Sequence, residues 1–492
     1  MRDGLNFQGS SLVGEHNSYA GEGVVSGIID QASFSFGGFH FTTDGFRRNA
    51  DQQDDIADAF VQYALTPQTN IQAEYRYRNS LRGDLALRFF DENFRPDERN
   101  RDEKNVYRVG FRHEFAPNST VLGSFTYQEE DFGLRDLHPQ EPGLTLIDLK
   151  RPDQAYGAEL QHQFRGSWFS VTSGFGYFDV NSHIDSRVGI DLPPPTLFPA
   201  TLDEDALHIN AYVYSYLRPL EHVLVTLGGS GDFLNTDSVE LATRNQFNPK
   251  AGISWEPWSG TVVRAAGFRT LKRTLVTDQT LEPTQVAGFN QFFDDINGTA
   301  AWRYGAALDQ QLGADVYAGV EVSKGDLEVP FLDFSVVADG RGAHTSWNEA
   351  QGRAYLFWTP RDWLALRTEY QYERARRSEL LADGVTSMDT QRVPVGISLF
   401  LPQGFSGAFR ATYVHQHGRF EDISGASFRS GSSDFALLDL SVSYRLPQRY
   451  GIVSLATTNL LDRHFNYFDT DRNNPMFQPA RAIFGRITLA FP

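Results

Sequence analysis

The sequence predicts an all-β protein, a transmembrane antiparallel up-and-down β-barrel of about 22 strands, within a range of about 18–22. We expect a single barrel domain over residues 1–492. Three observations predict this fold. Apolar and polar residues alternate with a period of two along most of the chain, short turns alternate with long polar loops, and no run approaches the roughly 18 apolar residues that a membrane-spanning helix needs.

The composition agrees with a barrel. Mean hydropathy is −0.39, as expected when lipid-facing apolar residues alternate with lumen-facing polar residues. The formal net charge of −18 argues against nucleic acid as a partner, because a phosphate backbone would be repelled. The N-terminus has no apolar segment of the signal-peptide type, so we expect the export signal to be absent from this chain.

The clearest alternation runs from Ile71 to Phe89. One parity is apolar and is expected to face lipid: Ile71, Ala73, Tyr75, Tyr77, Leu81, Leu85, Leu87 and Phe89. The other parity is polar or charged: Gln72, Glu74, Arg76, Arg78, Arg82, Asp84 and Arg88. Such a face carries too much charge to be buried in a dry core, so it predicts a water-filled lumen.

Strands of the same kind are expected along the rest of the chain. One rim has short turns, such as Thr66–Asn70, Ala116–Ser119 and Leu401–Gly404. The other rim has long polar loops, expected at about residues 45–54, 91–103, 136–153, 181–204, 273–297, 328–346 and 418–433. Short periplasmic turns and long outer loops are typical of outer-membrane barrels.

Tryptophans gather beside the short turns: Trp168, Trp255, Trp258, Trp358 and Trp363. In barrels, aromatic side chains concentrate at the two membrane–water interfaces. A soluble sandwich would instead spread them through the strand centres. We therefore predict that these tryptophans are membrane-interface residues.

The lumen-facing parity supplies candidates for solute contact: Glu74, Arg76, Arg78, Arg82, Arg108, Arg112, Arg367, Glu369 and Gln371. Arginine guanidinium groups bind carboxylate and phosphate groups in a bidentate manner. An alternative stays open, because any water-filled lumen must be lined with polar groups of both signs. The pattern thus fits either a solute site or simple hydration.

Motifs for catalysis or metal binding are weak. Acidic residues in the expected outer loops, among them Asp97 and Asp102, lack the spacing of a calcium-binding loop. His415, His417 and Asp422 occur without a nucleophile motif. We expect a protein that is not an enzyme, with no catalytic residues, no metal site and no cofactor.

The C-terminal stretch from Gly451 carries a more specific pattern. Asn459-Leu460-Leu461-Asp462-Arg463 is followed by Gln478-Pro479-Ala480-Arg481 and by the alternating strand Ala482–Phe491. This order resembles the C-terminal end of TonB-dependent outer-membrane receptors. The resemblance implies a location in the outer membrane of a Gram-negative bacterium and uptake of a bulky solute such as a ferric siderophore. It also implies lipid, lipopolysaccharide and a TonB-type energy-transducing protein as partners.

Receptors of this family carry a globular plug before the barrel, whereas here the expected strands begin within the first tens of residues. No plug domain is recognised, so we expect a removed plug, a separate periplasmic or plug module, or loops folded into the lumen. Two alternative functions stay open. One is a plug-less export or secretion conduit attached to a trimmed periplasmic domain, and the other is a surface barrel with an adhesive or structural role.

Overall fold

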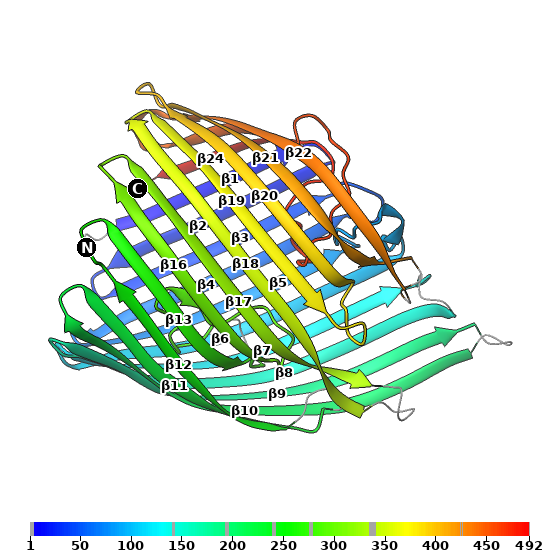
Figure 1. Ribbon diagram of the computed structural model, residues 1–492, viewed down its shortest axis with the longest axis horizontal. Helices are drawn as coiled ribbons and strands as arrows, with labels where there is room; N and C mark the ends of the chain where they lie inside the picture. Colours follow the sequence, from blue (N-terminus) through cyan, green and yellow to red (C-terminus); the bar gives the residue numbers. More distant parts are fainter. Residues whose placement is uncertain are drawn as a thin grey trace.

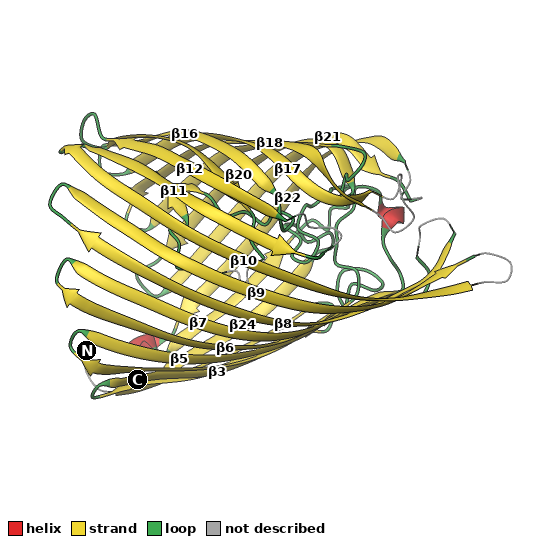
Figure 2. Cartoon of the chain, turned by 90° about the horizontal axis from the view of Figure 1, so that it is seen from below, coloured by secondary structure: helices red, strands yellow, loops and turns green. Residues whose placement is uncertain are grey.

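The computed structural model describes residues 4–139, 143–191, 196–238, 243–274, 279–333, 341–423, 425 and 427–491. These residues form one closed barrel of 22 antiparallel strands (Figures 1 and 2), which confirms the predicted fold class and strand number. A separate two-stranded hairpin, β14–β15, lies inside it. Within the described part of the chain, no helix is long and apolar enough to cross a bilayer.

The barrel strands are β1 (Gly4–Gly14), β2 (Ser18–Ile29), β3 (Ala32–Thr43), β4 (Gln52–Thr66), β5 (Thr69–Arg82), β6 (Glu98–Ala116), β7 (Ser119–Asp136), β8 (Leu144–Arg165), β9 (Phe169–Ile190), β10 (Thr196–Leu220), β11 (Val223–Thr236), β12 (Arg244–Trp255), β13 (Thr261–Leu271), β16 (Ala300–Leu312), β17 (Val316–Asp333), β18 (Arg341–Arg361), β19 (Leu364–Arg377), β20 (Val385–Phe400), β21 (Phe405–Glu421), β22 (Phe428–Arg445), β23 (Gly451–Thr458) and β24 (Ala482–Phe491). The inner hairpin is β14 (Gln285–Val286) and β15 (Phe289–Asn290), and two single helical turns are η1 (Asp91–Asn93) and η2 (Pro447–Arg449).

Strand β6 shows how the alternation builds the wall. Tyr107, Val109 and Phe111 are 45%, 57% and 43% exposed on the outside of the barrel. Arg108 and Arg112, on the other parity of the strand, point into the lumen and line a chamber there. Since successive side chains of a strand point to opposite faces, one ribbon meets hydrocarbon outside and water inside.

The barrel closes where β1 pairs with β24. The ladder runs from Phe7 opposite Phe491 to Gly14 opposite Phe484. Arg486 of β24 faces the lumen, and its guanidinium donates to the hydroxyl group of Ser10 at 3.3 Å. Closure pairs both edge strands, so the sheet has no exposed edge.

Several predicted outer loops are shorter than expected, because the strands continue into them. Strands β8, β9 and β10 have 22, 22 and 25 residues and extend beyond one end of the barrel (Figure 2). Where a strand leaves the membrane, both of its faces meet water, so the alternation fades although the backbone ladder continues. The parts of the predicted loops at 140–142, 192–195, 275–278, 334–340, 424 and 426 lie outside the described residues.

The predicted strand Ile71–Phe89 is wrong at its C-terminal end, since β5 stops at Arg82. Residues 83–97 form a loop that folds into the lumen. Leu85, Leu87 and Phe89 are 6%, 6% and 4% exposed in this loop, so they do not face lipid. Protein, rather than hydrocarbon, covers them, and the intervening Ala86 is also only 5% exposed.

Candidate functional site

Six of the predicted solute contacts lie on the lumen face of β5 and β6: Glu74, Arg76, Arg78, Arg82, Arg108 and Arg112. The carboxylate of Glu74 lies 3.0 Å from the guanidinium of Arg108, and Asp54 of β4 lies 3.3 Å from Arg78. Arg112 is paired with a glutamate of its own strand. These three guanidinium groups have carboxylate partners, which offset part of the positive charge of this wall.

The other three predicted contacts, Arg367, Glu369 and Gln371, lie on β19, on the opposite side of the ring of 22 strands. Glu369 accepts hydrogen bonds from Arg353 of β18 at 2.9 Å and from Gln371 at 3.0 Å. Arg367 is exposed to the lumen. The nine residues therefore form two polar walls that face each other, and they do not converge on one point.

Two chambers lie on the β4–β10 side of the lumen. The first, of about 410 Å³, is near the short turns and is lined by Arg108 and Arg112 among others. The second, of about 440 Å³, is nearer the outer rim and is lined by Lys104 and Asp153 among others. Residues of the segment 279–299 contribute to both chambers, so this segment lies between them.

We call residues 279–299 the inward hairpin. It includes β14 and β15 and packs on the lumen side of β12 and β13. Val286 and Phe289 are 0% and 6% exposed and pack beside Tyr214. At its tip, the Cβ of Ala287 lies so close to β12 that a Cβ added to Gly252 would be 2.7 Å away. Glycine at position 252 thus permits the hairpin to approach the wall.

A buried cluster of charges holds the inward hairpin. Arg273 lies 3.2 Å from Asp232 of β11 and also forms an ion pair with Glu282 of the hairpin. These three side chains are 3%, 2% and 0% exposed. His208 lies 3.0 Å from Asp232, and the hydroxyl group of Tyr214 donates to Glu282. Each charge has a partner, which is the condition for burying charges at tolerable cost.

Sequence reasoning missed this cluster, because it assigned residues 273–297 to a polar outer loop. The sequence of the strands behind the hairpin did contain an indication of this cluster. His208, Asp232 and Lys250 fall on the lumen parity of adjacent strands β10, β11 and β12, and all three are buried. Charged residues at neighbouring lumen-facing positions are stable in a hydrated lumen, but they also offer ion-pair partners to a charged loop segment such as that of Glu282.

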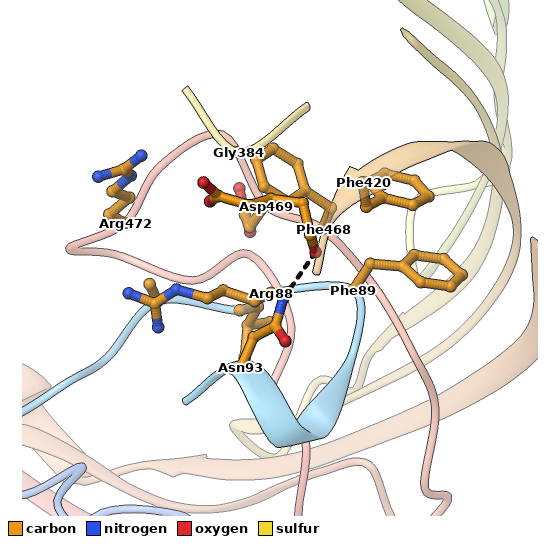
Figure 3. Close-up of a pocket in the computed structure, with 11 residues that line it drawn as sticks. Arg88, Phe89, Asn93, Gly384, Phe420, Phe468, Asp469 and Arg472 are labelled. Carbon is orange, nitrogen blue, oxygen red and sulfur yellow. Dashed lines mark hydrogen bonds between the residues drawn. The ribbon is translucent and has the colours of Figure 1, made fainter. Parts of the chain in front are cut away.

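A second structure crosses the outer end of the lumen. We call it the bridge, and it consists of residues 83–97 and 459–481. The rings of Phe89 and Phe420 of β21 are stacked, with centroids 4.1 Å apart and planes at 2° (Figure 3). Beside them the side-chain amide of Asn93 donates to the backbone oxygen of Glu421 at 2.7 Å.

The second segment of the bridge joins the first segment to β21. The buried amide of Gln416 donates to the backbone oxygen of Phe468 at 3.0 Å and accepts from its backbone N–H at 2.7 Å. The backbone N–H of Asp469 donates to the oxygen of Leu87 at 3.0 Å. Burial raises the pKa of the Asp469 carboxyl group above its usual range. The second segment is therefore hydrogen-bonded both to β21 and to the first segment of the bridge.

The predicted interface tryptophans all lie near the rim of short turns. Trp168, Trp255, Trp258, Trp358 and Trp363 are between 44% and 65% exposed. Sequence reasoning did not single out a second outward aromatic row about half-way along the strands, formed by Tyr75, Tyr107, Tyr127 and Tyr156. These tyrosines are directly opposite one another on β5–β8, with ring centroids 5.0, 6.1 and 5.0 Å apart. Their shared outward parity was the signal that could have identified them.

The two histidines that were weighed as catalytic candidates lie on the outer surface of β21. His415 and His417 share one face of β21, with ring centroids 5.3 Å apart. This face is the outward one, since the intervening Gln416 is buried under the bridge. Nδ1 of His415 lies 2.7 Å from Asp434. Among the described residues, no group of three histidine, aspartate or glutamate side chains is placed to hold a metal ion.

No family model and no curated protein matches the chain. Solved structures match over its whole length. The copper transporter OprC is 12% identical, with a TM-score of 0.75, and the match covers 100% of this chain and 80% of that one. The ferripyoverdine receptor of the outer membrane of Pseudomonas aeruginosa is 11% identical, with a TM-score of 0.74, covering 99% and 72%.

The FrpB iron transporter from Neisseria meningitidis has a TM-score of 0.76 at 10% identity, covering 100% of this chain and 82% of that one. The chain has the barrel fold of TonB-dependent receptors. In this receptor-type barrel, the C-terminal pattern has a structural role. Asn459 is 1% exposed, and its side-chain amide donates to the backbone oxygens of Arg463 at 3.0 Å and of Gln478 at 3.2 Å. The residues that resemble the family thus tie together the two ends of segment 459–481.

Proposed function

We propose that the chain is an outer-membrane receptor barrel that imports a bulky solute such as a ferric siderophore. The observation that carries this proposal is the wide 22-stranded lumen, lined by two polar walls and narrowed by its own segments. A barrel of this size has room for a solute larger than those that pass narrow barrels. Structurally similar proteins include a copper transporter, a ferripyoverdine receptor and an iron transporter.

We place the barrel in the outer membrane of a Gram-negative bacterium. In this arrangement the five predicted tryptophans lie at the periplasmic interface, and the tyrosine row lies at the outer interface. Lipid and lipopolysaccharide contact the outward faces of the strands. A TonB-type protein supplies energy from the periplasmic side, and a separate periplasmic or plug module meets the same rim.

Solute contact is proposed for the two polar walls. Arg367 on β19 is exposed to the lumen, and Glu369 and Gln371 continue the same face. Guanidinium and carboxylate groups at such positions bind the hydroxyl, carboxylate and amide groups that metal-chelating solutes present. Residues with strong partners, such as Arg108, contribute mainly a hydrated surface.

The test is transport in cells. The chain, given an export signal, is produced in a strain that lacks its own ferric-siderophore receptors, and uptake of radioactive iron is measured for a panel of ferric siderophores. We expect saturable uptake that stops when the TonB system is removed. Arg367→Gln should raise the half-saturating concentration, whereas Arg101→Gln, on the outward face of β6, should not.

Other outcomes separate the alternatives. Absence of saturable uptake for every solute, together with large stable channels in planar bilayers, would favour the export conduit. Absence of both uptake and channels would favour the adhesive or structural barrel.

A further inference from the structure

We infer that the wall behind the inward hairpin contains a carboxylate-binding site, which Glu282 of the hairpin occupies and for which a carboxylate-bearing solute competes. The site deepens the proposed function, because it assigns a chemical group to the solute. Transport of that solute rests on the proposed function. The existence of the site rests on the contacts of Glu282 alone.

Donors from several parts of the wall converge on the carboxylate of Glu282. The side-chain amide of Asn210 donates to its Oε2 at 3.0 Å, and the hydroxyl group of Tyr214 donates to its Oε1. The guanidinium of Arg273 forms an ion pair with Oε2, and Nζ of Lys250 lies 4.0 Å from Oε1. These donors come from β10, from β12 and from the residues that follow β13. Together they are matched to the two oxygens of a carboxylate, whichever molecule carries it.

The charge balance of the cluster also requires an anion at this position. Counted at formal charge with histidine neutral, Lys250 and Arg273 contribute two positive charges, and Asp232 contributes one negative charge. These side chains are 2%, 3% and 2% exposed. Buried charges are tolerated at low cost only when they are paired. The wall is therefore one anion short, and Glu282 supplies it.

Arg273 has a donor that Glu282 does not satisfy. Its Nε donates to Asp232 at 3.2 Å, and one terminal nitrogen pairs with Glu282. The other terminal nitrogen, Nη1, is buried and has no acceptor among the described residues. A carboxylate that is not tethered to the hairpin can lie parallel to the guanidinium and accept from both terminal nitrogens. The site thus offers a free carboxylate one hydrogen bond more than it gives Glu282.

The site lies beside open space in the lumen. Thr280 and Leu281, immediately before Glu282, line the chamber of about 410 Å³. Glu159 of β8 holds both of them, since it accepts from the hydroxyl group of Thr280 at 2.5 Å and from the backbone N–H of Leu281 at 3.0 Å. A solute in this chamber therefore contacts the hairpin next to the site, and it reaches the site when Glu282 leaves the wall.

Competition with Glu282 gives solute binding a particular sign. Glu282 and a solute carboxylate cannot occupy the same donors, so the solute binds only the fraction of molecules in which the hairpin is off the wall. The apparent affinity is reduced by that fraction. Changes that weaken the docking of the hairpin should therefore strengthen solute binding, whereas a cluster with only a structural role predicts no such gain.

The experiment measures binding of succinate, used as the carboxylate probe, to the whole chain in detergent micelles by isothermal titration calorimetry. Succinamide, its neutral analogue, is the control ligand, and sodium chloride holds the ionic strength constant. Glu282→Gln removes the competing charge. Gly252→Ala acts on the hairpin without changing any charge, because the added Cβ would lie 2.7 Å from the Cβ of Ala287. Glu256→Gln, in the exposed turn after β12, is the matched control for loss of one carboxylate.

We expect Glu282→Gln and Gly252→Ala each to bind succinate roughly tenfold more tightly than the unmodified chain, and Glu256→Gln to bind it equally. Arg273→Gln in the Glu282→Gln background removes the guanidinium and should weaken binding roughly tenfold. Heat-modifiability on gels verifies that each barrel is folded. Equal succinate affinities for the unmodified chain and both hairpin variants would overturn the inference. Absence of binding in every folded protein, or equally tight binding of succinamide, would do the same.

Displacement of the hairpin supplies a second measurement. The chain contains no cysteine, so Val286→Cys and Val385→Cys each carry a single thiol. Both positions are 0% exposed, the first in the inward hairpin and the second in the apolar cluster beside the bridge. Saturating succinate should accelerate modification of Val286→Cys by a small thiol reagent and leave Val385→Cys unchanged. An unchanged rate at Val286→Cys would show that the probe does not displace the hairpin, which would overturn the inference.

Failure of the proposed function has a different outcome. Absence of saturable uptake in cells would count against transport and would leave the calorimetric ranking of the variants as it is. Conversely, saturable uptake together with equal succinate affinities would retain the receptor and remove the carboxylate site.

Discussion

The carboxylate of Asp462 accepts the backbone N–H of Arg481 at 2.9 Å, across the base of the segment that forms half of the bridge. Asp462 has a positive φ of 51°, a conformation that aspartate and asparagine tolerate better than most residues. Together with the bonds of Asn459, this contact fixes the entrance and exit of residues 459–481. The residues that resemble the receptor family, Asn459 and Asp462 among them, thus hold the two ends of this segment together. We call these contacts the clasp.

Loss of the clasp should destabilise the barrel measurably. Asp462→Ala removes a hydrogen bond to a charged acceptor, so we expect a loss of about 1–3 kcal/mol in the free energy of unfolding. The measurement is a urea titration in detergent micelles or lipid vesicles, followed by tryptophan fluorescence. Asp315→Ala, in the exposed short turn after β16, is the control. Equal midpoints for the two variants would contradict the assigned role.

The two faces of the barrel wall should differ in how much an introduced charge destabilises the fold. Val109→Arg places a guanidinium on the outward face of β6, where we expect a cost of about 2–4 kcal/mol if the site is near the bilayer midplane. Ser124→Arg places the same group at the edge of the chamber of about 410 Å³ and should be mild. Refolding into lipid vesicles across a urea series compares them. The assignment of faces fails if Ser124→Arg costs as much as Val109→Arg.

Substitutions within the buried charge cluster should have non-additive effects on the free energy of unfolding. Arg273→Ala leaves Asp232 and Glu282 buried without their partner, so we expect a loss of about 3–5 kcal/mol in stability, or release of the inward hairpin. Arg273→Ala with Glu282→Ala removes both signs and should cost less than the sum of the single variants. Urea titrations and limited proteolysis of residues 279–299 measure both effects. Strict additivity would mean that the ion pair does not hold the hairpin.

The second segment of the bridge should loosen as pH rises. Burial raises the pKa of Asp469 above its ordinary value of about 3.9. A carboxyl group shifted upward on folding contributes stability below its unfolded pKa, and this contribution is lost as pH rises through the folded pKa. Arg392 and Asp471 are the charged groups whose fields act on it, and they oppose each other.

Hydrogen exchange checks this expectation. The backbone N–H groups of Asp471 and Met476 donate to Asp469, and their exchange, corrected for intrinsic rates, should accelerate from about pH 4 upward. Asp469→Asn removes the titrating group and should make the corrected rates independent of pH. A pH dependence that is the same in both proteins would assign the effect to another group.

The barrel itself could be predicted because lipid imposes a strict rule on every spanning strand. Val109 and Phe111 must face hydrocarbon and Arg108 and Arg112 must face water, so parity alone identifies the wall. Leu85, Leu87 and Phe89 were misassigned for the same reason. An apolar residue that faces a protein core has the same signature as one that faces lipid. Only contacts with strands far away in the sequence, such as Phe89 with Phe420 and Leu87 with Val414, distinguish them.

The buried cluster could not be predicted because its members come from distant parts of the chain. Asp232 and Glu282 are separated by a strand pair and a loop, and neither spacing nor composition shows that Arg273 joins them. The predicted loops failed in extent at β8–β10, where both faces of each strand are wet. There the backbone hydrogen bonds to the neighbouring strands maintain the strand conformation. These bonds do not depend on an alternating side-chain pattern, so the sequence does not show them.

The pairing of β1 with β24 also constrains how this molecule reaches its native state. The two strands of that ladder are separated by almost the whole polypeptide, so the contact has the highest sequence separation in the sheet and carries a large loop-closure entropy. Until it forms, two unpaired ribbon edges are open to other chains. We therefore expect this seam to seal last, and the two edges to need protection from other chains until it does.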